Sequence, residues 1–177
     1  VTGLAGNYLD NTDARLLTPS YNLTQAGTYT LRFSTKYNTE NDFDGFRVQY
    51  TLDKGATWTQ LGSAGTGWYT FANASGGTAF PAGVAFFEGA QGTYVQRSQD
   101  ISFLAGNASV AFRIQFASDF TVNSAGVAID DFEILGPVNP PLAPTAAGAS
   151  ISGRVMLSNG TGIRNAAISI TGNSLTQ

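Results

Sequence analysis

The segment 45–61, GFRVQYTLDKGATWTQL, constrains the fold of this chain more than any other part of the sequence. Before its turn, apolar and polar residues alternate with a period of two, which is typical of a strand with one buried face. The turn DKG at 53–55 then supplies a carboxylate that accepts backbone hydrogen bonds and a glycine that can adopt a positive φ. The segment therefore predicts a β-hairpin. The apolar positions of its first strand are Phe46, Val48 and Tyr50.

The residues around this turn, TLDKGATW at 51–58, resemble an Asp-box hairpin, a pattern found in sialidases and in many unrelated secreted β-proteins. The resemblance implies that Asp53 ties the turn together through hydrogen bonds with the backbone and with Thr57. It also implies that Gly55 completes the turn and that Trp58 packs its ring inward. A local turn accounts for all of these residue types, so we assign them a structural role.

The composition favours strands and excludes several kinds of chemistry. Charged residues make up only 12% of the 177 residues, and the glycine content (Gly 21) favours turns over helices. The sequence contains no histidine and no cysteine, which excludes zinc sites, Cys–His catalysis and Ser–His catalysis. A net charge of −3 gives no indication of a nucleic-acid partner. No apolar run reaches the roughly 20 residues of a membrane-spanning helix, so we expect no membrane insertion.

Further alternating segments extend this prediction to an all-β, antiparallel sandwich. The expected strands are 28–37, the hairpin at 44–61, 94–101, 108–117 and 126–135. In the last of these, the buried register changes between its two halves, which predicts a β-bulge near Asp130 and Asp131. An entry strand before Pro19 is expected at a sheet edge, where proline is tolerated. Residues 62–92 show little periodicity and are expected to form a long loop.

This succession resembles the meprin/A5/mu (MAM)-like jelly-roll sandwiches of bacterial secreted proteins. The resemblance lies in 28–37, 44–61, 101–119 and 126–134, and DGFRVQYTLDKGATW and AGVAIDDFEIL carry it most closely. It implies a jelly-roll fold and a generic role in adhesion or ligand binding at an extracellular location or the cell surface. We therefore expect residues 1–135 to form a MAM-like jelly-roll sandwich.

The composition changes after this domain. Residues 136–149 hold four of the six prolines and predict an extended Pro/Ala-rich linker. Residues 150–177 predict a β-hairpin that resembles the start of a carboxypeptidase-regulatory-like, transthyretin-type domain, and is incomplete by comparison with it. An isolated hairpin leaves its apolar face uncovered. The residues of that face are Ile151, Val155, Leu157, Ile168 and Ile170.

Two interpretations of this hairpin remain open. It can add to a sheet of a neighbouring subunit, which gives a head-to-tail homopolymer or fibre. Alternatively, it is a piece of a second domain that is ordered by packing against neighbouring domains of the same protein.

Acidic residues in the expected loops offer the hard oxygen ligands that calcium prefers. The candidates are Asp10, Asp13, Glu40, Asp42, Asp44, Asp130 and Asp131. Loops at one end of a sandwich can bring carboxylates together, so we predict a calcium site made by Asp42, Asp44, Asp130 and Asp131. The alternative is that Asp42 and Asp44 are solvated loop charges and that Asp130 caps the bulge.

Aromatic residues in or beside the long loop suggest a second kind of ligand. Trp68, Tyr69 and Tyr94 could form a flat platform on which a sugar stacks, although aromatic residues in a sandwich more often belong to the core. The Asp-box hairpin, the alternating strands and the absence of histidine and cysteine predict a non-catalytic adhesion or assembly module, a structural subunit of a surface fibre or of a multidomain surface protein. The alternative is a carbohydrate-binding accessory module of a secreted hydrolase.

Overall fold

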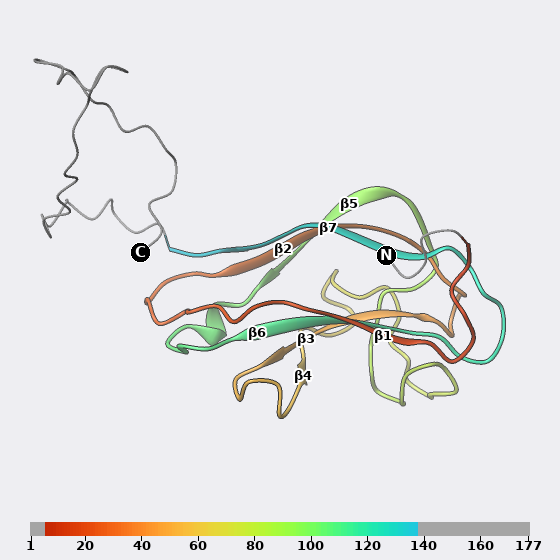
Figure 1. Cartoon of the computed structure of the whole chain (residues 1–177), viewed down its shortest axis with the longest axis horizontal. Helices are drawn as coiled ribbons and strands as arrows, with labels where there is room; N and C mark the ends of the chain where they lie inside the picture. The colour runs from red at the N-terminus through yellow and green to blue at the C-terminus, as the bar shows by residue number, and fades with distance from the viewer. Residues whose placement is uncertain (1–5, 138–177) are drawn as a thin grey trace, which may run out of the picture. The chain divides into compact units, whose positions relative to one another are not determined.

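The computed structural model describes residues 6–137, which form two antiparallel sheets packed face to face (Figure 1). One sheet has the strand order β1-β6-β3-β4, and the other has the order β5-β2-β7. The elements are β1 (Asp13–Leu17), β2 (Thr30–Asn38), β3 (Gly45–Thr51), β4 (Thr59–Gln60), β5 (Ala90–Asp100), the 3-10 turn η1 (Ser102–Leu104), β6 (Ala111–Ala117) and β7 (Gly126–Leu135). The predicted all-β antiparallel sandwich is confirmed, whereas the C-terminal hairpin and most of the linker lie outside the described residues.

The predicted hairpin at 45–61 forms from β3 and the short β4. Gln49 pairs with Gln60 across the two strands. In the turn between them, both Lys54 (φ 60°) and Gly55 (φ 93°) have a positive φ. Glycine adopts such a value without strain. Asp53 accepts hydrogen bonds from the backbone N–H and the hydroxyl of Thr57 at 2.9 and 2.6 Å, as the Asp-box pattern predicts.

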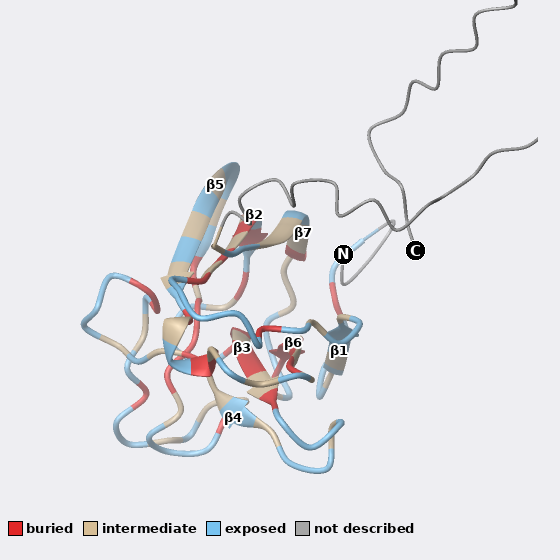
Figure 2. Ribbon diagram, turned by 90° about the vertical axis from the view of Figure 1, so that its left-hand side faces the viewer, coloured by how far each residue is buried: buried red, intermediate tan, exposed pale blue. Residues whose placement is uncertain are grey.

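The core lies between the two sheets and is rich in aromatic rings. Figure 2 shows buried residues on the inner strands β2, β3 and β6, with β5 mostly exposed at one edge. Alternation places every second residue of these strands in the core, as the sequence predicts for β3 and β6. The core residues of these two strands are Phe46, Val48, Phe112, Ile114 and Phe116.

The predicted irregularity in the last strand is present. Along the β2–β7 pair, Arg32 lies opposite Glu133 and Ser34 lies opposite Asp130, so β7 carries one extra residue. Asp131 adopts φ 50° in this bulge. The bulge changes which residues of β7 face the other sheet.

The segment 62–89 contains no named strand, but it is tied to the first sheet. Phe87 forms an antiparallel bridge with Phe46, through backbone hydrogen bonds of 2.8 and 3.0 Å. The segment therefore continues the sheet beside β3 where β4 has ended. Its neighbour Phe86 packs with Phe80 and Ala117 in a second small apolar cluster.

Within residues 6–137, no helix is long and apolar enough to span a membrane.

Candidate metal centre

Three carboxylates come together at one end of the sandwich. Glu40 and Asp44 belong to the loop between β2 and β3, and Asp119 follows β6. Each contributes an oxygen, and these oxygens all lie within 4.8 Å of one another. The pairing of β3 with β6 explains this arrangement, because Gly45 lies opposite Ala117 and the chain continues from both into the same end of the sheet.

Asp44 is the most buried member of this acidic cluster, with 0% of its surface exposed. Its Oδ1 accepts a hydrogen bond of 2.7 Å from the backbone N–H of Asp119. Its Oδ2 is buried and has no hydrogen-bond partner among the described residues, and the same is true of Oε2 of Glu40. A buried acceptor without a partner costs about 1–3 kcal/mol, and more when it is charged. A proton or a cation bound at these two oxygens would remove this cost.

Tyr8 closes the cluster from the N-terminal side. Its hydroxyl accepts a hydrogen bond of 3.1 Å from the backbone N–H of Glu40. It also lies beside the Asp44 carboxyl, where the contact favours the ionised form of Asp44, but its geometry falls short of a hydrogen bond to Oδ2 of Asp44. The hydroxyl lies 3.4 Å from the carbonyl oxygen of Val122. Burial, and then the neighbouring Asp44, raise the pKa of Tyr8 to about 12. The Tyr8 side chain beside the acidic cluster is therefore uncharged at all moderate pH values.

Both loop carboxyls are pushed toward their protonated forms. Burial raises the pKa of Asp44 above its ordinary value, and the negative charges of Asp119 and Asp10 add to this, whereas the Asp119 N–H and the Tyr8 hydroxyl act to lower it. Burial also raises the pKa of Glu40, with further contributions from Asp119 and Asp44. A cation in the cluster would act in the opposite direction, because it favours the ionised forms.

An amide oxygen and a further carboxylate lie close to this end of the molecule. Asn123 donates from Nδ2 to Oδ1 of Asp10 at 2.6 Å, and its own Oδ1 is buried without a partner in the described part of the chain. Carboxylate and amide oxygens are the ligands that calcium takes, with about six to eight oxygens including water. The donor set fits calcium and offers no nitrogen or sulfur for zinc.

The structure places the four predicted calcium ligands in different surroundings. Asp44 belongs to the acidic cluster, whereas Asp42, Asp130 and Asp131 are not members of it. Asp42 is exposed in the same loop, and its backbone N–H donates to Glu88. Asp130 and Asp131 lie in the bulge of β7, where Oδ1 of Asp130 accepts from the backbone N–H of Asp131 at 2.9 Å. This last contact matches the alternative in which Asp130 caps the bulge.

The predicted sugar platform requires a correction. Trp68 and Tyr69 are 3% and 6% exposed and belong to the core, so neither ring can stack on a sugar in this conformation. The Tyr69 hydroxyl donates to the carbonyl oxygen of Leu61 at 2.8 Å, and the indole N–H of Trp68 donates to the same oxygen at 3.1 Å. Of the three rings only Tyr94 is exposed, at 49%, with Nζ of Lys36 5.1 Å from its centroid.

Trp58 also differs from its predicted position. Its ring is half-buried on the outer side of the sheet, under the guanidinium of Arg113, and is not part of the core. The predicted assembly residues Ile151, Val155, Leu157, Ile168 and Ile170 lie outside the described residues.

Asp119 is the residue that sequence analysis missed. It lies two residues after the β6 pattern, and Asp44 directly precedes the β3 pattern, but their proximity can be recognised only when the pairing of these two strands is known. No family model and no curated protein matches this sequence.

Proposed function

We propose that residues 6–137 form a calcium-stabilised, non-catalytic module of an extracellular adhesion or assembly protein. The observation that carries the calcium proposal is the buried, unpartnered Oδ2 of Asp44 beside two other carboxylates. A calcium ion would satisfy that oxygen and would join the β2–β3 loop to the segment after β6. The extracellular and adhesive role is proposed from the resemblances to secreted β-proteins and MAM-like sandwiches.

The position of the cluster favours a structural over a catalytic use of these carboxylates. A glycosidase needs two carboxyl groups on either side of a bond in an accessible cleft, about 5–9.5 Å apart. Asp44 is fully buried, and the buried Tyr8 lies against its carboxyl. A carboxylate enclosed in this way can hold an ion within a fold, but it cannot reach a polymeric substrate.

The calcium proposal predicts a change in melting temperature. We expect the transition of the wild-type chain to rise by about 5–10 °C when calcium is added at roughly 100 times its dissociation constant, relative to chelator. Asp44→Asn should abolish this rise, because it removes the buried charge and one oxygen ligand. Calorimetry or circular dichroism in calcium and in chelator measures the difference.

Asp42→Asn is the matched control for this experiment. It removes a carboxylate from the same loop, two residues away, where the side chain is exposed. We expect this variant to keep the full response to calcium. Identical melting curves of the wild-type chain in calcium and chelator would refute the proposal, as would equal responses of the two variants.

A proton is the competing partner for the unpaired oxygens, and pH separates the two. A carboxyl whose pKa is raised in the folded state stabilises the fold at low pH, and this stability is lost as pH rises through the folded-state value. In chelator, we therefore expect stability to decrease as pH rises above the ordinary Asp44 value of 3.8. Calcium should reduce this decrease. Asp44→Asn should reduce it even without calcium.

A further inference from the structure

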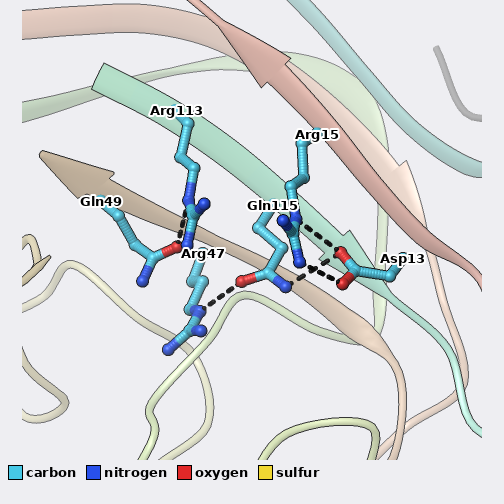
Figure 3. Close-up of polar contacts among 6 residues, drawn as sticks. All are labelled: Asp13, Arg15, Arg47, Gln49, Arg113 and Gln115. Atoms are coloured by element: carbon cyan, nitrogen blue, oxygen red, sulfur yellow. Dashed lines mark hydrogen bonds and ion pairs between the residues drawn. The ribbon is translucent and has the colours of Figure 1, made fainter. Parts of the chain in front are cut away.

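The outer face of the sheet β1-β6-β3-β4 carries a regular set of arginine and glutamine side chains (Figure 3). Alternation along each strand places these residues opposite the core face. Across the strands, Gln115 of β6 lies between Arg15 of β1 and Arg47 of β3. In the next row, Arg113 of β6 lies beside Gln49 of β3. We call these five residues the arginine–glutamine face.

The glutamines hold the arginines in fixed orientations. Oε1 of Gln115 accepts a hydrogen bond of 2.9 Å from Nε of Arg47, and Oε1 of Gln49 accepts one of 2.7 Å from Nε of Arg113. Gln49 and Gln115 are only 4% and 7% exposed, so their own positions are set by packing. Figure 3 shows these contacts as two parallel pairs on neighbouring strands.

Aromatic rings support the same two guanidinium groups. Arg113 lies over the Trp58 ring at 4.4 Å, and Arg47 lies over the Phe80 ring at 5.1 Å from the centroid. Such stacking on a ring face limits the rotation of a guanidinium. Both groups are thus oriented before any ligand binds.

The face has an excess of positive charge on a chain whose net charge is −3. The acidic residue beside this face is Asp13, which forms an ion pair with Arg15 at 2.6 Å and accepts a hydrogen bond from Gln115. Neither Arg47 nor Arg113 has an ion-pair partner among residues 6–137. Burial lowers the pKa of both groups, and the attraction of the nearby Asp13 charge opposes this shift only in part.

The terminal nitrogens of these arginines remain available. Neither Nη atom of Arg113 makes a hydrogen bond within the described part of the chain, and Arg47 uses one Nη in a long contact of 3.5 Å with Gln60. With Nε already bound to glutamine, the outer edge of each guanidinium offers donors to a ligand. Two parallel N–H donors match the two oxygens of a carboxylate.

We propose that the arginine–glutamine face binds an acidic polysaccharide through the carboxylates of its uronate residues. Arg15 and Arg47 lie two strands apart, which is about 10 Å at ordinary strand spacing and allows contacts to more than one sugar unit. The groups that this face offers to a ligand are guanidinium groups, whereas the fully buried centre of a protein–protein interface is usually more apolar. These features favour a hydroxyl- and carboxylate-bearing glycan over an acidic protein partner.

Titration calorimetry of the full chain with oligogalacturonate tests this proposal. The measurement is made in chelator, so that calcium cannot bridge ligand and protein and the metal centre does not contribute. We expect binding of oligogalacturonate, and none of neutral oligogalactose. Arg113→Gln should weaken binding by about tenfold or more, which is the usual effect of losing hydrogen bonds between charged groups.

Arg32→Gln is the matched control, because it makes the same charge change on β2 of the other sheet, where Arg32 pairs with Glu133. Its affinity should equal that of the wild-type chain. Arg113→Lys keeps the charge but loses the bidentate donor, so weaker binding at an unchanged melting temperature supports directed carboxylate recognition. If Arg113→Gln fails to fold, the same titration is made with Arg15→Gln, because the Arg15 side chain is exposed.

Three results would overturn the proposal. The first is no binding of oligogalacturonate. The second is equal binding of neutral oligogalactose, or of polyglutamate, which would indicate an acidic protein partner. The third is full affinity in both Arg113→Lys and Arg15→Gln.

Discussion

At the scale of single residues, Asp44 and Asp53 show how one side chain type acquires opposite properties. Asp44 is buried with one oxygen unpaired, and burial raises its pKa. Asp53 is exposed, and hydrogen bonds from Thr51 and Thr57 lower its pKa to about 2. The ionised form is thus disfavoured at Asp44 and favoured at Asp53, so a cation suits the first position, whereas the second needs none.

The lowered pKa of Asp53 predicts how the hairpin responds to acid. A carboxyl with a depressed folded-state pKa stabilises the fold above its unfolded value, and this stability is lost as pH falls. For Asp53 the loss should occur between the ordinary value of 3.8 and about 2. We expect Asp53→Asn to lower stability at neutral pH and to show a smaller loss in this acid range. Urea denaturation between pH 2 and 6 measures both effects.

Asp42→Asn again serves as the comparison, because it removes an exposed carboxylate that accepts no hydrogen bond from a described residue. Equal acid sensitivity of Asp53→Asn and the wild-type chain would show that the turn does not depend on the ionised carboxylate.

At the scale of elements, the predictable parts of this fold are those specified locally. The hairpin and its turn follow from a period of two and from the turn residues between the strands, and the bulge in β7 follows from a change of period within one segment. The segment 62–89 was not predictable, because its order depends on the bridge between Phe46 and Phe87. The burial of Trp68 and Tyr69 depends on the same non-local pairing.

The acidic cluster likewise combines residues that could be recognised from local sequence with one that could not. Acidic residues in the loop after β2 could be recognised as candidate ligands from the sequence. Their partner Asp119 lies 75 residues from Asp44, and only the register that places Gly45 opposite Ala117 brings the two together. Local patterns therefore indicated a kind of ligand and one loop, whereas the set of ligands required the topology.

Gly45 is the element-scale position at which a substitution should be most damaging. A Cβ atom there would lie 2.1 Å from the backbone oxygen of Phe87 and 2.5 Å from the Phe86 ring. That oxygen accepts the backbone hydrogen bond from Phe46, so it cannot move without loss of the bridge. We expect Gly45→Ala to destabilise the fold by about 1–3 kcal/mol, measured by urea denaturation.

Gly92→Ala provides the control, since Gly92 lies in β5 and a Cβ atom there meets nothing within 4 Å. It should leave stability unchanged or slightly raised, because alanine restricts the unfolded chain. A destabilisation equal to that of Gly45→Ala would mean that the close contact with Phe87 is not the cause.

At the scale of the whole molecule, the described residues have a hydrophobic core of their own. Its buried members run from Tyr8 to Val127, and they come from both sheets. The two candidate sites use different parts of this unit, the acidic cluster an end of the sandwich and the arginine–glutamine face the outside of one sheet. The proposed calcium site therefore lies within the fold, whereas the proposed glycan site lies on its surface, so the two can be tested independently.

Residues 150–177, which lie outside the described residues, form the part of the chain that is expected to mediate assembly. The apolar positions of this sequence include Val155 and Ile168, and an isolated hairpin is only marginally stable in water. If it adds to a sheet of a neighbouring subunit, deletion of residues 150–177 should convert an oligomer into a monomer. The melting temperature of the monomer should stay close to that of the sandwich in the full chain, because the described core is retained. Light scattering coupled to size-exclusion chromatography measures the mass.

Val155→Asp in the full chain keeps the length and should also give a monomer, because a charge on the apolar face opposes burial against a partner. An unchanged oligomeric state in both proteins would rule out assembly through this segment.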